Sequence, residues 1–281
     1  MGRPDQTLKS EEENMSKLFY LYGIIPQHEQ KESQLPSLKG LDDKHDVYLL
    51  PFGEIVAVGC NLDEQEYGED QLHEKTNQME WVQDKAYHHH NTLLTIREHF
   101  TVIPMKFCTI YSSEASLKQM LESQHENLVV QLSSLENKEE WNLKIYCDSV
   151  KFKEQVEAHN FNIEAKKEEI SQMSPGRQYL ERRKLEQLIN EEVQKEQQAF
   201  CAELHQELES YSQNSAVKKN WNKDVTGRTE DMCWNSAYLF STTNVDHVLK
   251  RITEFKSEAA EKGWEIEATG PWPAYHFANL S

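Results

Sequence analysis

The chain has 281 residues, 30 of them basic and 48 acidic, which gives a net charge of −18 at neutral pH. This length is sufficient for two domains. The negative charge argues against binding to nucleic acid or to an anionic membrane surface, because both require clustered lysine and arginine. The longest apolar stretch, around residues 18–26, is too short to span a bilayer, so we expect a soluble protein with no membrane partner.

The first fifteen residues are polar and lack the apolar core of a secretory signal, so residues 1–15 are predicted to form a disordered leader. The five cysteines are odd in number, widely spread and never arranged as Cys-x-x-Cys. This spacing predicts neither a disulfide framework nor a zinc site. We therefore expect a cytoplasmic location.

Residues 16–138 are predicted to form an N-terminal α+β domain. Its expected strands are short, rich in aromatic or β-branched residues, and bounded by turn-forming residues; they cover 18–26, 47–50, 55–58 and 101–111. Apolar residues recur at three- and four-residue steps between Thr76 and Phe100, which predicts a helix. Ser112 or Ser113 can cap a second helix.

Residues 139–281 are predicted to form a second domain. Its expected strands lie at 141–148, 216–225, 232–241 and 264–269. Long helices occupy about 150–211 with a break at Met173–Gly176, and a further helix follows Asn244. This order indicates a modified ferredoxin-like domain whose first crossover carries a long helical, coiled-coil-like insertion. The long helix could form an intramolecular hairpin or a coiled coil with another protein.

No group of residues in the sequence supports catalysis or cofactor binding. Three adjacent histidines, His88–His90, would point about 100° apart on a helix, so they cannot converge on one metal ion. We expect one buried and two solvated histidines. The chain contains neither a nucleophile elbow nor a glycine-rich phosphate loop. The sequence therefore predicts a protein that is not an enzyme and has no cofactor and no metal.

Four segments together resemble the gas vesicle accessory proteins of the GvpF/GvpL family, and the length, the leader and the acidity of the chain favour the GvpL branch. The segments are Tyr20–Ile24, His90–Asn91 ahead of Thr101–Phe107, Ser174–Arg183 and Gly270–Phe277. Two positions depart from the family pattern. Cys108 stands where a glycine is common, and Ala274 where proline is often repeated.

Eight residues within these segments are candidate partner contacts: Pro104, Phe107, Arg177, Tyr179, Arg182, Arg183, Trp272 and Tyr275. The arginines form a local basic cluster that could pair with Glu181 and Glu186, or dock onto an acidic partner. The C-terminal aromatic residues could pack on their own domain or contact a partner.

The resemblance implies an assembly factor, chaperone-like helper or minor structural component of gas vesicles. Its expected partners are the small hydrophobic shell subunit and other gas vesicle accessory proteins during nucleation and formation. An exposed sheet edge could cover the strands of that subunit. The alternative is a ferredoxin-like module that senses a small molecule, because a fold alone does not fix a function.

Overall fold

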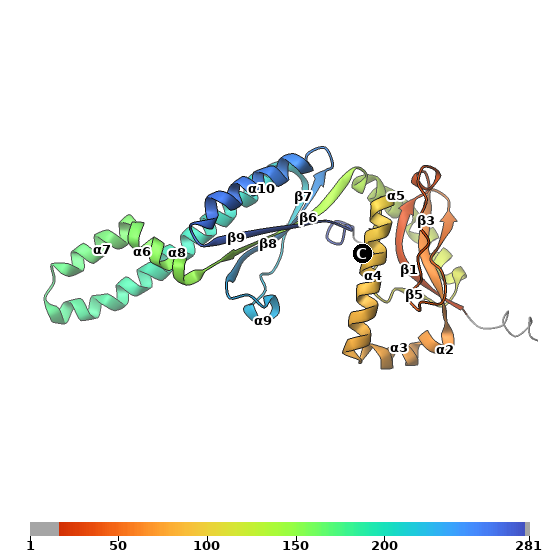
Figure 1. The fold of residues 1–281 in the computed structure, drawn as a ribbon, viewed down its shortest axis with the longest axis horizontal. Helices are drawn as coiled ribbons and strands as arrows, with labels where there is room; N and C mark the ends of the chain where they lie inside the picture. The colour runs from red at the N-terminus through yellow and green to blue at the C-terminus, as the bar shows by residue number, and fades with distance from the viewer. Residues whose placement is uncertain (1–16, 279–281) are drawn as a thin grey trace, which may run out of the picture. The chain divides into compact units, whose positions relative to one another are not determined.

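The computed structural model describes residues 17–278, which divide into two compact units (Figure 1). The first unit comprises the chain up to Asn137 together with the chain from Trp272 on, and the second is Lys138–Pro271. The sequence-based assignment of all of 139–281 to one domain is therefore wrong at its end, because the C-terminal aromatic residues pack on a helix of the first unit. The predicted leader lies outside the described residues.

The first unit contains one antiparallel sheet. Its strands are β1 (Lys17–Pro26), β2 (Tyr48–Phe52), β3 (Ile55–Asp63), β4 (Ile103–Pro104) and β5 (Ile110–Tyr111). Their order is β2-β3-β1-β4, and β5 also pairs with β1. Only two short pieces of the expected 101–111 strand pair with β1; a turn separates them. The central position of β1 explains why nine of its ten residues are buried.

The helices of the first unit are η1 (Glu29–Lys31, a 3₁₀ helix), α2 (Glu64–Tyr67), α3 (Glu69–Thr76), α4 (Met79–His99) and α5 (Glu114–Leu135). Two of them, α4 and α5, pack against the sheet. Leu93 and Ile96 of α4 share one buried cluster with alternate residues of β1, and α5 contacts β1 and β3. Ser113 begins α5 through a capping box with Ser116, which confirms the expected cap.

The second unit contains a four-stranded sheet. Its strands are β6 (Lys138–Cys147), β7 (Ser212–Val217), β8 (Asp231–Ser241) and β9 (Trp264–Trp272), in the order β7-β8-β6-β9. The predicted strand 216–225 is wrong over most of its length, because the chain leaves the sheet after Val217 and forms the short helix α9 (Lys223–Thr226). Asn222 caps α9, and Gly227 ends it in a left-handed conformation.

A helical hairpin connects β6 to β7 (Figure 1). It consists of α6 (Ser149–His159), α7 (Phe161–Ser171) and α8 (Pro175–Tyr211). The expected break near Met173–Gly176 is confirmed. A second break at Asn160, whose side chain accepts from two backbone N–H groups of α7, was not expected. Both α6 and α7 pack on α8, so the helix is part of an intramolecular hairpin.

The core of the second unit lies between its sheet and the helices α8 and α10 (Val245–Ala260). The apolar residues of α10 at helical spacing, such as Val248, Ile252 and Phe255, are buried there, as expected. Trp264 of β9 stacks on Phe200 of α8 with ring centroids 4.3 Å apart. Within residues 17–278, no helix is long and apolar enough to cross a membrane.

Candidate functional site

The three histidines of α4 each contact a different tyrosine. His88 Nε2 lies 3.1 Å from the Tyr22 hydroxyl, and His89 Nδ1 lies 2.7 Å from the Tyr20 hydroxyl. These tyrosines are both on β1, where the burial of one strand face brings them under α4. The side chains of the adjacent histidines therefore diverge, as expected for neighbouring residues on a helix. No group of three or more His, Cys, Asp or Glu residues that could hold a metal ion occurs in the described part of the chain.

His89 is the buried histidine of the three, with 4% of its surface exposed. Its Nε2 lies 3.1 Å from the Met105 carbonyl oxygen, which can only accept, so Nε2 carries the proton and Nδ1 accepts from Tyr20. Burial lowers the pKa of His89 to about 4. Both ring nitrogens are used in holding β1, α4 and the β4–β5 connection together, so this neutral imidazole is a structural group.

His90 receives the C-terminal segment of the chain. Its Nδ1 lies 2.8 Å from the Tyr275 hydroxyl, and its ring lies 5.3 Å from the Trp272 ring. Desolvation lowers the pKa of His90 as well. Trp272 is half-buried, whereas Tyr275 keeps 38% of its surface exposed. The segment therefore packs on its own unit and still presents one aromatic ring to solvent. His88 and His90 are thus half-buried rather than fully solvated.

A cavity of about 510 Å³ lies beside this cluster. Its lining includes Pro104, Lys106, Phe107 and Tyr275. The walls of the cavity combine apolar surface with hydroxyl groups and one lysine. The buried His89 also lines the cavity, but both of its ring nitrogens are already hydrogen-bonded. Such a lining suits an apolar side chain of a partner better than a reaction.

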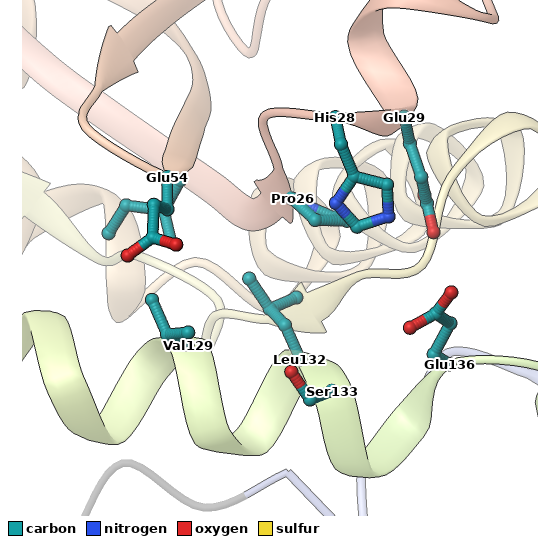
Figure 2. Close-up of a pocket in the computed structure, with 9 residues that line it drawn as sticks. Pro26, His28, Glu29, Glu54, Val129, Leu132, Ser133 and Glu136 are labelled. Carbon is teal, nitrogen blue, oxygen red and sulfur yellow. The ribbon is translucent and has the colours of Figure 1, made fainter.

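A smaller notch of about 120 Å³ lies between the end of β1 and α5. Figure 2 shows Leu132 rising from α5 towards Pro26 and Val129 rising towards Glu54, with Glu136 at the other side. Glu29 also lines the notch, and its carboxylate accepts a hydrogen bond of 2.6 Å from the backbone N–H of Thr101. The notch has room for a single side chain.

Cys108, which stands where the family pattern commonly has glycine, has a left-handed backbone conformation. Cys108 has φ of 65°, and its N–H donates a 3.3 Å hydrogen bond to the Tyr20 hydroxyl. A side chain at positive φ costs energy that glycine avoids. The structure therefore supplies a physical reason for glycine at this position and shows that Cys108 is strained.

We expect Cys108→Gly to raise the free energy of unfolding by about 1 kcal/mol, because relief of the left-handed strain exceeds the extra freedom of the unfolded chain. Urea unfolding of the wild type and the variant measures the difference. Cys108→Ala is the matched control: it removes the thiol but keeps the Cβ atom, so it should leave the stability nearly unchanged. Equal gains in both variants would show that the thiol, not the backbone, is responsible.

The eight candidate contact residues separate into two groups. Pro104, Phe107, Trp272 and Tyr275 gather around α4 in the first unit. The other four, Arg177, Tyr179, Arg182 and Arg183, lie exposed near the start of α8 in the second unit.

The interpretation that these arginines pair with neighbouring glutamates is wrong. Glu181 binds Lys184 and Lys166 instead, and Glu186 binds Lys153. In the part of the chain that the structure describes, none of the three arginines has an acidic partner. Sequence spacing alone could not reveal this, because the competing lysines include two on α6 and α7.

Sequence reasoning missed the tyrosines Tyr20 and Tyr22 as partners of the histidines. Both lie on the same side of a strand, and the histidines lie 66 to 69 positions later in the chain. The one available signal was the presence of two tyrosine hydroxyl groups in a central strand whose other side chains are nearly all apolar, since a buried tyrosine hydroxyl needs a partner.

The fold matches two solved structures. The crystal structure of the gas vesicle protein GvpF from Anabaena sp. PCC7120 has a TM-score of 0.70 and 18% identity, covering 95% of this chain and 100% of that chain. GvpF from Microcystis aeruginosa has a TM-score of 0.64 and 18% identity, covering 94% and 99%. The molecule is therefore a mixed α+β protein with two antiparallel sheets and the fold of these gas vesicle proteins.

Sequence comparison places the chain more narrowly. Gas vesicle protein L of Streptomyces sp. (strain CB03234) is 25% identical over 236 residues, which are 83% of each chain. Gas vesicle protein L1 of Halobacterium salinarum is 24% identical over 277 residues, covering 98% of this chain and 95% of that protein. The model of the gas vesicle synthesis protein GvpL/GvpF family matches residues 18–279, so the chain belongs to this family. The expected membership of this family is confirmed.

Proposed function

We propose that this protein is a non-enzymatic, cytoplasmic accessory protein of gas vesicle formation. It binds the hydrophobic shell subunit, shields that subunit from aggregation before incorporation, and acts together with other accessory proteins. Membership of the gas vesicle family supports the general role. The observation that supports the binding mechanism is an edge strand of the second unit that leads into exposed apolar residues.

Strand β7 forms one edge of its sheet, with β8 as its neighbour. The Ser215 N–H bonds the side chain of Asn214 at 2.9 Å instead of β8, so it faces away from the sheet. Unlike the edge strand β2, which contains Pro51, β7 has no proline. An edge of this kind can pair with a strand of another protein.

Apolar side chains follow this edge along the chain. Val217, Trp221 and Val225 are exposed by 57%, 47% and 66%. A shell subunit with an apolar face would gain contact with these side chains while its backbone pairs with β7. The negative net charge of the protein would keep the complex in solution.

The second unit supports the ferredoxin-like interpretation. The strand order β7-β8-β6-β9, with helices after the first and third strands along the chain, fits a ferredoxin-like domain. In this view the hairpin of α6, α7 and α8 enlarges the first crossover. The domain then presents β7 as a free edge on one side and the hairpin as a projecting arm.

Co-expression of this protein with the shell subunit tests the proposal by the fraction of subunit that stays soluble and co-purifies. We expect the wild type to raise that fraction, and Ser215→Pro to abolish the gain because it removes the outward N–H. Ser215→Ala is the matched control: it removes the same hydroxyl, which binds Glu209 at 2.7 Å, but keeps the N–H. Equal rescue by all three forms would rule out pairing at β7.

A second experiment, on purified vesicles, can separate a helper from an incorporated component. A helper should be absent from washed vesicles, whereas a minor shell component should remain until urea strips it. Quantitative detection in vesicles before and after urea treatment distinguishes these outcomes. Neither outcome alters the prediction for Ser215→Pro, because both roles require binding of the subunit.

A further inference from the structure

The tip of the helical hairpin is an ordered structure. The side-chain amide of Gln178 donates to the carbonyl oxygens of Met173 and Ser171, at 2.8 and 3.3 Å, and so holds the turn between α7 and α8. Ile170, at the end of α7, is buried. These contacts fix the first turns of α8 relative to α7, so the side chains on the outer surface of α8 are held on a rigid element.

Two large apolar side chains lie on this outer surface. Tyr179 and Leu180 are exposed by 74% and 64%. Arg183 follows Tyr179 by four residues and Leu180 by three, so the three side chains share one face of the helix. Arg182 lies three residues after Tyr179 and flanks the same face. We define the hairpin tip surface as Arg177, Tyr179, Leu180, Arg182 and Arg183.

The hairpin tip surface has an excess of positive charge, although the protein as a whole is acidic. Residues 175–184 contain four basic side chains and one acidic side chain, in a chain whose net charge is −18. The acidic side chain, Glu181, is bound by Lys184 at 2.7 Å and Lys166 at 3.6 Å. Those lysines hold the pKa of Glu181 below its usual value. The guanidinium groups of Arg182 and Arg183 thus remain available to an external anion.

We propose that the hairpin tip surface docks an acidic segment of another protein, one that carries carboxylates beside an apolar side chain. Arginine binds carboxylates with two parallel hydrogen bonds, and Tyr179 and Leu180 supply apolar area next to them. Arginine and tyrosine are, with tryptophan, the residue types enriched among the side chains that contribute most to binding at protein interfaces. The proposal concerns a surface separate from β7 and does not depend on binding of the shell subunit.

A protein segment fits this surface better than other anions do. Nucleic acid and anionic membranes carry extended negative charge, which a protein with net charge −18 repels beyond the local cluster. A second copy of this chain is repelled for the same reason. A short acidic segment of another protein can approach the three arginines without bringing such an extended charge.

The test measures binding of the full chain to a fluorescent synthetic helical peptide. In this peptide, glutamates and leucines lie three or four residues apart, so that both occupy one face of the helix. We expect Arg182→Glu combined with Arg183→Glu to weaken binding at least about tenfold, since two charge-assisted contacts are lost. Tyr179→Ala should weaken it less. The matched control reverses two exposed lysines of α10, Lys250→Glu with Lys256→Glu, and should leave binding within about twofold.

Two further arms make the result decisive. A peptide with glutamine in place of glutamate should bind weakly, and added salt should weaken the glutamate peptide. The proposal is overturned if both peptides bind equally or if the control pair loses as much affinity as the arginine pair. It is also overturned if the arginines instead govern binding to phosphatidylglycerol vesicles, to single-stranded DNA or to a second copy in sedimentation velocity. Circular dichroism of each variant checks that these exposed substitutions leave the fold intact.

Discussion

The first unit is expected to lose stability as the pH falls from 6.5 towards 4, with His89 contributing about 3 kcal/mol of the loss. The pKa of His89 is lowered to about 4 by burial, so the unfolded chain takes up a proton that the folded chain refuses. The unfolded state therefore binds more protons throughout this interval, and stability rises with pH across it. The contribution is fully present above 6.5 and is gone below 4.

Hydrogen exchange of peptides from β1, measured between these two pH values and corrected for the intrinsic exchange rate, reports the stability of the first unit by itself. The variant His89→Gln cannot titrate at this position and should reduce the slope to the part that His88 and His90 contribute, because burial lowers the pKa of these two histidines as well. The variant is less stable than the wild type at neutral pH because one hydrogen bond is lost. His73→Gln, at an exposed position of α3, should leave the slope unchanged. A wild-type slope that survives in His89→Gln would assign the effect to other groups.

Trp264→Ala should destabilise the second unit by about 4 kcal/mol, because it removes a buried indole from a well-packed core. Trp264 stacks on Phe200 of α8 and meets Phe152 of α6 edge to face, with centroids 5.0 Å apart. It thus joins the last strand to two helices of the hairpin. Its loss should release the base of the hairpin before the rest of the unit.

Urea-dependent hydrogen exchange of peptides from α6 and α8 measures this effect. We expect these peptides to exchange at lower urea in Trp264→Ala, while peptides from β1 in the first unit keep their wild-type protection. Trp221→Ala is the matched control, since this tryptophan is 47% exposed and its ring contact with Lys144 is on the surface. A similar loss from the control would show that the aromatic contacts of Trp264 are not what holds the hairpin base.

The regular elements could be predicted from the sequence because their burial is periodic. The central strand β1 is continuously apolar, α10 has a clear apolar stripe, and Ser113 precedes a helix with the expected cap. The predictions that were wrong concern segments where a side chain that caps a helix competes with the tendency of its neighbours to continue a strand or a helix. Residues 218–225 contain strand-forming side chains, but Asn222 caps a short helix there and the sheet ends at Val217. Asn160 similarly interrupts a region that favours helix throughout.

The sites depended on contacts between distant residues. The sequence indicated that the adjacent histidines diverge, because helix geometry spreads them, and each of the three lies within hydrogen-bond distance of a different tyrosine hydroxyl. It could not indicate that each would meet a hydroxyl group, since Tyr20 and Tyr275 lie far from α4 in sequence. The pairing of Glu181 was wrong for a related reason: Lys166 of α7 is close only after the hairpin closes.

From the sequence by itself came the family, through the resemblance of four segments, and the mixed α+β class with most element positions, because these follow from local periodicity. Tertiary structure decided where the chain after Trp272 belongs, which histidine is buried, and which arginines remain unpaired. The physical reason is that burial and ion pairing depend on which groups meet across the folded chain. When a lysine from a neighbouring helix forms the ion pair with a glutamate, the arginine next to that glutamate in sequence stays available to a partner.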